Sequence, residues 1–458
     1  MEQNNNAPDL ADIQGLIITG YTHPFSCHMV FQFGATDKIA SFMKAIYPYV
    51  RPATIWFVKP NNMLNIGLTW TGINKINSKL DPSKFDPEFV IGSAGDNPQQ
   101  SLCDIGPSDP SNWVFGNNTI PVDCLVHIYG LTNDYLQTLV TIVSDAANAA
   151  GFTEIFPISN KQRLEQYQLE PNHIHFGYHD GISEPDLNKS LEPLPQETYT
   201  DPANLNNFLL NYGPNVSAFF PLPAGASTEA KFAANGCYNA FRMLEQDSEK
   251  FETFLSENAE VIAPQIKKDL EYSKEWLAAK VIGRWRNGSP LILSPDMPDH
   301  ATAKATKFEF NGDPMGFKCP ISAHTRVANP RDTVMLPQDA PIPRILRRGV
   351  PYGAPHTVES GLIGLFLCGS FANQFEMVSG WINRNNFTPP LSGEYPMPQD
   401  AILANRQVSG TTNTFEIPIS PDGKSTITPP PTLTQFIITK GSAYCLLPSL
   451  STLRSCFE

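Results

Sequence analysis

Proline and glycine recur along the whole chain and set the main constraint on its fold. There are 42 Pro and 30 Gly among 458 residues, about one position in six. Proline breaks helices and glycine weakens them, so coiled coils and long helical bundles are excluded. The 41% of apolar residues, which include 28 Phe, still allows sizeable cores. At this length we expect two or three domains.

The charge balance argues against a nucleic-acid partner. Asp and Glu number 45 against 32 Lys and Arg, a formal net charge of −13, and the sequence contains no basic run. Proteins that bind phosphate backbones need a basic surface. The most apolar stretch, residues 362–368, is far shorter than the roughly 20 residues that a spanning helix needs, so we expect no membrane association.

The first residues, MEQNNNAPDLADIQ, are polar and acidic. They lack the basic and apolar segments of a secretory signal, and no twin-arginine signal is visible. We therefore expect a cytoplasmic protein, or an extracellular one if the chain is a processed form. The eight Cys are widely spaced without a C-x-x-C pair, which indicates reduced thiols and not a disulfide framework.

Short β-like runs alternate with amphipathic helices in the first 190 residues. Apolar residues at i, i+3, i+4 and i+7 predict a helix that Thr132 or Asn133 caps and Gly151 ends. This alternation favours an antiparallel sheet with helices on one face. The other predicted elements are strands at 16–19, 29–33, 55–58 and 125–129 and a helix at 38–47.

A Pro- and Asn-rich segment from 191 to 226 separates this part from a second one. We place the domain boundary at its start, which gives an N-terminal domain of residues 1–190 and a C-terminal domain of residues 191–458. The second part repeats the alternation of strands and helices, although no repeat is legible residue by residue. Its predicted elements are strands at 238–244 and 362–368, helices near 251–255, 270–281 and 371–382, and a hairpin of 436–439 with 443–447.

One segment gathers side chains with metal-binding chemistry. His173, His175 and His179 lie close together, and Asp180 follows directly. Two His separated by one residue on a strand point to the same side, as zinc and iron sites require. The pattern equally fits a polar strand end followed by a turn between glycines, and two His alone do not decide between these interpretations.

Two further segments carry single functional side chains. His324 lies between Pro320 and Pro330, which predicts an irregular segment that presents the imidazole. An isolated His is more often structural than a ligand. Arg347 and Arg348 precede a predicted turn, where a solvated pair is the ordinary interpretation.

Taken in order, these three segments resemble the motifs of the dye-decolorizing peroxidases, haem enzymes of the dimeric α+β-barrel type. Gly177, Asp180 and Gly181 match G-x-x-D-G, residues 324–331 (HTRVANPR) match H-x-R…N-P-R, and residues 346–349 match L-R-R-G. The resemblance extends over nearly the whole chain. It implies an α+β fold of two ferredoxin-like domains, each an antiparallel sheet with helices packed on it.

The resemblance also implies a role for each motif residue. His324 would be the proximal ligand of the haem iron. Arg326 would pair with a haem propionate, because a guanidinium fork suits a carboxylate. Asp180 would be the distal acid–base group and Arg347 the distal positive charge. His173, His175 and His179 would then be structural.

Further contacts to the cofactor follow from the same resemblance. Phe366 and Ser183 would line the haem site. Gly364 stands where the family generally has a bulkier apolar residue, which implies a roomier pocket. The second N–H of a proximal imidazole usually bonds a carboxylate or a carbonyl, and Asp400, with Glu376 as the second candidate, would accept it.

These residue types suit the heterolysis of peroxide, which needs a group that moves a proton between the two oxygens and a cation that favours charge separation. A carboxylate, with a reference pKa of about 4, stays a base in mild acid, where an imidazole of about 6.5 is protonated. We therefore expect an acidic working range.

The expected protein is a haem b peroxidase with one haem per chain. It would reduce hydrogen peroxide and oxidise bulky aromatic donors such as anthraquinone dyes and phenols. Because bulky dyes cannot reach a buried porphyrin, we expect Tyr352 and Trp381 to carry electrons from the surface; Trp381 fits a core position equally well.

Two alternatives stay open. One is a haem-binding protein that handles haem or iron with little peroxidase activity. The other is a non-haem metallohydrolase that uses His173, His175 and His179.

Overall fold

The structure is a computed structural model that describes residues 8–170, 172–185, 187, 205–211, 225–334, 342–387, 397–427 and 433–458. The predicted domain boundary between residues 190 and 191 lies outside these ranges. No helix among the described residues combines the length and the apolar character needed to cross a bilayer.

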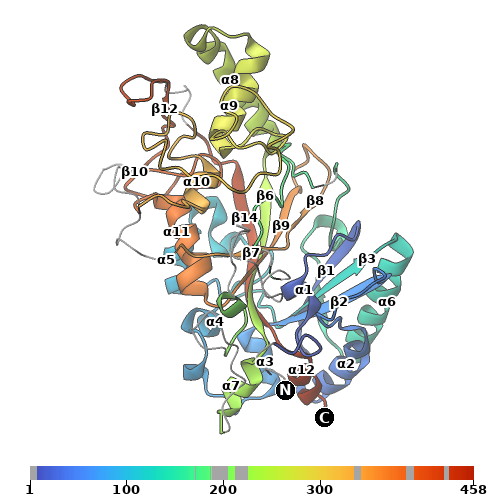
Figure 1. The fold of residues 1–458 in the computed structure, drawn as a ribbon. Helices are drawn as coiled ribbons and strands as arrows, with labels where there is room; N and C mark the ends of the chain where they lie inside the picture. The colour runs from blue at the N-terminus through green and yellow to red at the C-terminus, as the bar shows by residue number, and fades with distance from the viewer. Residues whose placement is uncertain are drawn as a thin grey trace, which may run out of the picture.

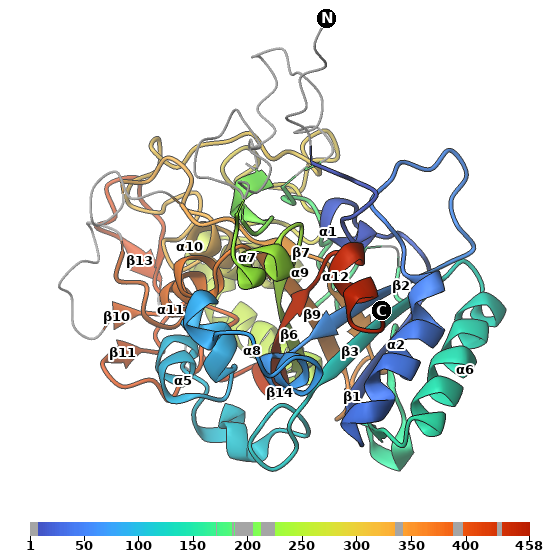
Figure 2. The ribbon, with the colours of Figure 1, turned by 90° about the horizontal axis from the view of Figure 1, so that it is seen from below.

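The N-terminal half forms an antiparallel sheet with two helices side by side on one face (Figures 1 and 2). Its strand order is β4-β1-β3-β2, and a helix follows β1 and β3, as in the ferredoxin-like fold. The cap prediction for α6 is confirmed, since the Thr132 hydroxyl accepts a hydrogen bond from Tyr135 N. The elements are β1 (Phe25–Gln32), α2 (Ile39–Ile46), β2 (Asn62–Leu68), β3 (Cys124–Gly130), α6 (Asn133–Ala149) and β4 (Thr153–Ile155).

The C-terminal half repeats this strand order as β14-β6-β9-β7, with β8 beside β9. The duplication that is illegible in the sequence is therefore visible in the topology. The expected α+β class with two ferredoxin-like units is confirmed. The elements are β6 (Cys237–Gln246), α8 (Ser248–Ile266), α9 (Leu270–Ile282), β7 (Leu346–Arg347), β8 (Val350–Tyr352), β9 (Gly361–Cys368), α11 (Met377–Arg384) and β14 (Ile437–Leu447).

The two halves join into one ten-stranded sheet, because Leu446 of β14 pairs with Leu68 of β2. Successive side chains alternate between the faces of a strand. On β6, Phe241 and Met243 therefore pack between the two halves, whereas Arg242 and Leu244 point to the opposite face. That second face carries the cavity described below.

The remaining elements are short. The helices are α1 (Gly15–Ile18), α3 (Trp70–Ile76), α4 (Pro87–Ile91), α5 (Asp96–Leu102), α7 (Thr228–Ala233), α10 (His324–Ala328) and α12 (Leu450–Ser455), and a π-helical turn at Phe371–Glu376 leads into α11. The strands are β5 (Leu164–Glu165), β10 (Met397–Pro398), β11 (Thr411–Thr412), β12 (Ile417–Pro418) and β13 (Thr426–Ile427).

Three predicted elements are wrong. Residues 16–18 form most of helix α1, and Thr19 is its C-cap residue, so no strand is present here. Residues 55–58 form no strand, and Phe57 is fully exposed. A short apolar run does not distinguish strand, helix and exposed loop. The predicted hairpin at 436–447 is the single strand β14, because Gly441 marks a β-bulge and not a turn.

Candidate active site

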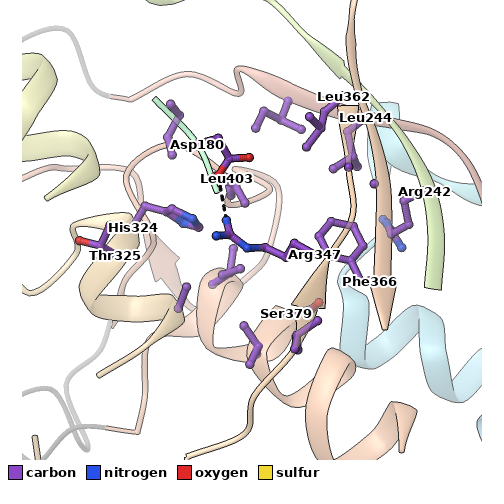
Figure 3. A pocket seen from close by; sticks show the side chains of 18 of the residues that line it. Asp180, Arg242, Leu244, His324, Thr325, Arg347, Leu362, Phe366, Ser379 and Leu403 are labelled. Carbon is purple, nitrogen blue, oxygen red and sulfur yellow. Dashed lines mark hydrogen bonds and ion pairs between the residues drawn. The ribbon is translucent and has the colours of Figure 1, made fainter. Parts of the chain in front are cut away.

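The main cavity, of about 340 Å³, lies on the outer face of the C-terminal half. Strands β6, β9 and β14 form one side of it, and α10, α11 and the loop around Asp180 close the others (Figure 3). The C-terminal half provides most of the apolar lining, which includes Leu244, Leu362, Phe366 and Leu403. The cavity therefore combines apolar walls with many polar and charged side chains.

His324, the first residue of α10, is held in a fixed orientation. Its Nδ1 lies 2.9 Å from Oδ2 of Asp400, whose other oxygen accepts hydrogen bonds from the backbone N–H groups of Ile402 and Leu403. Asp400 is fully buried. The carboxylate therefore takes the Nδ1–H, and Nε2 of the ring stays available on the side of the cavity. The second candidate for this partner, Glu376, bonds Tyr444 instead.

Arg347 and Asp180 meet across the same cavity. Nη1 of Arg347 lies 3.2 Å from Oδ1 of Asp180, and Figure 3 shows both side chains directed into the space that the His324 ring faces. Glu184 holds Arg347 from behind, with one carboxylate oxygen 2.7 Å from Nε and the other 2.7 Å from the backbone N. Glu184, together with Asp180, raises the pKa of Arg347 above its usual range.

The glycines of the G-x-x-D-G segment set the position of Asp180. Gly177 has a φ of 80° and Gly181 a φ of 76°, in the region that L-residues rarely adopt. A Cβ on Gly177 would also collide with the guanidinium of Arg286. Backbone hydrogen bonds from Asp180 to Asn172 and from His179 to Arg286 fix the loop between these glycines. The two turns therefore place the carboxylate at the cavity.

The two adjacent arginines, Arg347 at the end of β7 and Arg348 directly after it, make different contacts. Arg347 lies opposite Phe366 in the register with β9, so both side chains reach the main cavity. Arg348 instead donates hydrogen bonds to the carbonyls of Leu16 and Ile17 at α1. The two arginines therefore do not form the predicted solvated pair. Arg347 lies at the cavity, and Arg348 connects the end of β7 to the N-terminal half.

Arg326 does not line the main cavity among the described residues. Its Nη1 donates to the carbonyl of Cys319 at 2.8 Å and lies 3.5 Å from Asp313, and the side chain is 5% exposed. Arg331 does line the cavity, and its buried Nε has no partner among the described residues. The structure therefore brings Arg331, and not Arg326, to the place where an anionic group could be held.

Phe366, Gly364 and Ser183 all line the cavity. A Cβ on Gly364 would meet the ring of Phe366 at 2.3 Å. The Phe366 ring therefore occupies the space that a side chain at position 364 would fill. The hydroxyl of Ser183 accepts a hydrogen bond from Arg284 at 3.2 Å. Ser183 therefore supports a second cationic side chain at the cavity wall.

Tyr352 and Trp381 are core residues in this structure. Tyr352 is 1% exposed, and its hydroxyl has no partner among the described residues. Trp381 is 9% exposed and stacks on Phe387 at 4.5 Å. Neither ring is placed to touch a large donor at the surface.

The three histidines around position 176 do not converge. Nε2 of His175 lies 2.9 Å from the carbonyl of Tyr352, whereas the rings of His173 and His179 pack edge to face with centroids 5.5 Å apart. Among the described residues no cluster of three His, Cys, Asp or Glu side chains could hold a metal ion. The structure therefore offers no support for a metallohydrolase site here.

Two residues at the site were missed as functional candidates. Arg331 is the last residue of the quoted H-x-R…N-P-R segment, and Glu184 follows the G-x-x-D-G segment by three positions, but the sequence alone indicates no role for either. The signal that identifies them is tertiary: Glu184 reaches Arg347 on a distant strand, and Arg331 lines the cavity with a buried Nε that has no partner among the described residues.

The comparisons with known proteins agree with the motifs. No protein-family profile matches the chain. Dye-decolorizing peroxidase msp1 of Mycetinis scorodonius is 25% identical over 474 residues, which cover 98% of this chain and 87% of the relative. The prediction of a resemblance to this family over nearly the whole length is confirmed.

Solved structures show the same fold. The crystal structure of the DyP-type peroxidase of Anabaena sp. has a TM-score of 0.75 at 23% identity and covers 98% of this chain and 94% of its own. A dye-decolorizing peroxidase in complex with 2,6-dimethoxyphenol has a TM-score of 0.76 at 23% identity and covers 98% and 99%. Over nearly its whole length, the chain is therefore related in sequence and in fold to the dye-decolorizing peroxidases.

Proposed function

We propose that this protein is a haem peroxidase that reduces hydrogen peroxide and oxidises bulky aromatic donors, including anthraquinone dyes and phenols. The observation that carries the proposal is the convergence of two side-chain pairs on one cavity. His324 with Asp400 forms one pair, and Arg347 with Asp180 forms the other. The named relatives are dye-decolorizing peroxidases, and one neighbour was solved with a phenol.

The residues present fit one haem b per chain. His324 can supply Nε2 to the iron, since Asp400 takes Nδ1. The apolar walls suit a porphyrin, and the orphaned Nε of Arg331 suits a propionate. Bound haem would supply the redox chemistry that carries electrons from donors to peroxide.

Asp180 and Arg347 divide the work on the peroxide. Asp180 can take a proton from one oxygen of hydrogen peroxide and return it to the other, while bound haem would supply the electrons for the cleavage. Arg347 stabilises the negative charge that develops as the O–O bond breaks. Glu184 keeps the guanidinium in place, because it accepts hydrogen bonds from both Nε and the backbone N of Arg347. With a carboxylate as the base, we expect activity in mild acid.

An absorption spectrum with a peroxide assay tests this proposal. The purified chain, reconstituted with haem b, should show a Soret band, a stoichiometry of one, and turnover of hydrogen peroxide with 2,6-dimethoxyphenol that increases towards mildly acidic pH. A Soret band without any turnover would instead identify a haem carrier. No haem binding at all would refute the proposal.

A further inference from the structure

A second cavity, of about 360 Å³, lies on the other side of an aromatic wall from the main cavity. We call it the Trp70 cavity. Helix α3 begins at its edge with Trp70, α4 forms one side, and β14 contributes Ala443 and Tyr444. Figure 1 shows α3 and α4 beside the lower end of the sheet, away from α8 and α9.

The lining of the Trp70 cavity has the chemistry of a site for a neutral aromatic molecule. Trp70, Phe89 and Ile91 provide apolar walls, and Asp96 is the charged residue among its described lining residues. Ser93 is 3% exposed, and its Oγ has no hydrogen-bond partner among the described residues. An unpaired buried hydroxyl is unfavourable unless a ligand supplies the partner. A phenol offers both an apolar ring and a hydroxyl for Ser93.

Two aromatic rings in contact, Tyr444 and Phe375, connect the linings of the two cavities. Tyr444 lines the Trp70 cavity, and its ring centroid lies 6.2 Å from that of Phe375. Phe375 lines the main cavity and lies 5.2 Å from Phe366, which lines it as well. Tyr444 is the ring in this series that is readily oxidised, and it is the one that faces the second cavity.

Tyr444 also has a partner for its proton. Its hydroxyl donates a hydrogen bond of 2.9 Å to Oε1 of Glu376, which is 4% exposed. Burial raises the pKa of Glu376, so this carboxylate is readily protonated. A tyrosine loses an electron more easily when a base takes its proton in the same step. Tyr352 has no such acceptor among the described residues.

We propose that the Trp70 cavity binds a phenolic electron donor and that Tyr444 passes its electrons through the Phe375 ring to the main cavity. This inference rests on the proposed peroxidase function and assigns its reducing substrate a separate site. It replaces Tyr352 and Trp381 as the route for donors that are too large for the main cavity.

The step balances as follows. Tyr444 gives one electron towards the main cavity and its phenolic proton to Glu376. It recovers an electron from the phenol, through contact or through Trp70, and the proton from Glu376, while the phenol releases its own proton to water. Two phenols become two phenoxyl radicals, and one hydrogen peroxide takes up two electrons and two protons and becomes two waters.

The test separates binding from electron transfer. Ser93→Ala should raise the KM for 2,6-dimethoxyphenol by about two- to tenfold with little change in kcat, because one hydrogen bond to the donor is lost. Tyr444→Phe keeps the ring and should lose most of the kcat with little change in KM. Trp70→Phe should weaken binding of the phenol, measured by equilibrium dialysis without peroxide.

Two variants serve as matched controls, and one donor tests the main cavity alone. Tyr352→Phe also removes a buried tyrosine hydroxyl, and Trp381→Phe also replaces a tryptophan; both should keep wild-type kinetics with the phenol. Iodide is small enough to react in the main cavity, so its oxidation should be unchanged in Tyr444→Phe.

A spectroscopic measurement complements the kinetics. Freeze-quench EPR after peroxide, without a donor, should show a tyrosyl radical in the wild type and in Tyr352→Phe but not in Tyr444→Phe. Wild-type phenol kinetics in Tyr444→Phe, or equal losses in the Tyr352 and Trp381 variants, would overturn the inference. Absence of iodide turnover in the wild type would instead refute the peroxidase function. Binding of the phenol without peroxide would still show whether the Trp70 cavity holds it.

Discussion

The two halves of the sheet share a strand order but use their outer faces differently. In the N-terminal half, α2 and α6 lie across the strands and seal apolar residues such as Met29, Phe31 and Val126 beneath them (Figure 1). In the C-terminal half, α8 and α9 lie against each other beyond the end of the sheet. The strand face with Arg242, Leu244 and Gly364 is therefore left to border a cavity.

The histidines of the two halves show the same contrast. His28 and His127 are opposite each other in the register of β1 and β3, their Nδ1 atoms are 2.9 Å apart, and both are fully buried. His324 has a buried carboxylate behind it and an open cavity in front. Two histidines whose ring nitrogens are buried form a core contact. A histidine that binds a ligand needs one ring nitrogen that remains accessible. The following predictions test this comparison.

The largest effect is expected for His324→Ala. The proposed function assigns the iron to its ring, so the variant should lose iron coordination and most of the bound haem. The Soret band and the haem content of the purified protein measure this. His28→Asn, in the sealed pair, and His300→Ala, at an exposed position, should keep both. A His324→Ala protein with a full haem complement and an unchanged spectrum would refute the ligand assignment.

A smaller loss is expected for Asp180→Asn, which keeps the shape of the side chain but removes the base. The rate of peroxide activation in stopped flow should fall on the order of 10²–10⁴-fold. Arg347→Leu should reduce it comparably, since the developing charge is then uncompensated. The exposed Asp37→Asn serves as the control. If Asp180→Asn is near wild type while Arg347→Leu is inactive, the arginine is the main catalyst.

A moderate effect is expected for Asp400→Asn. The amide no longer attracts the Nδ1–H as a carboxylate does, so the His324 ring loses its fixed orientation and basicity. Haem affinity, measured by absorption titration, should fall by about 10- to 100-fold. Asp313→Asn removes a buried carboxylate that does not contact His324 and should leave the affinity unchanged. Equal losses in both variants would indicate a general effect on folding.

The last prediction concerns the sealed pair, whose effect appears as a pH dependence of stability. Burial lowers the pKa of His28 to about 3 and that of His127 well below its usual value. Both rings are thus neutral when folded and take up protons only on unfolding below about pH 6.5. The pair's contribution is complete above this pH, and the free energy of unfolding should decrease by up to about 1.4 kcal/mol per histidine for each pH unit below it.

Denaturant unfolding between pH 4 and pH 7 measures this slope. His28→Asn and His127→Asn should each make it shallower. Val30→Ala, on the same face of β1, should lower stability at every pH and leave the slope unchanged. A wild-type slope in either histidine variant would show that the pair does not titrate on unfolding.

The motifs predicted the positions of several cavity residues but not their surroundings. Asp180, His324 and Arg347 come from distant segments, and the structure brings all three to one cavity. Arg326 was chosen by analogy and lies outside it, whereas Arg331, only five positions on, lines it. Helix α10 ends at Ala328 between them and Arg331 has a φ of 55°, and no residue pattern indicates this change of backbone direction.

Secondary structure was predictable where the pattern was long. The 17 residues of α6 carry a full apolar stripe and a capping threonine, so both ends were predicted. Residues 16–19 and 55–58 offer only four positions each. That is too few to tell whether the apolar residues repeat every two positions, as in a strand, or every 3.6, as in a helix. Gly441 was read as a turn because a glycine in a strand is compatible with both a turn and a bulge.

The sequence by itself determined the α+β class, the absence of long helical architecture, and the residue types that suit peroxide chemistry, because these depend on local periodicity and on side-chain chemistry. Only the tertiary structure decided that β6 and β9 leave one face open, that Glu184 holds Arg347, and that Tyr444 stands between two cavities. Those facts depend on strand register and helix placement, which bring together residues that are far apart along the chain.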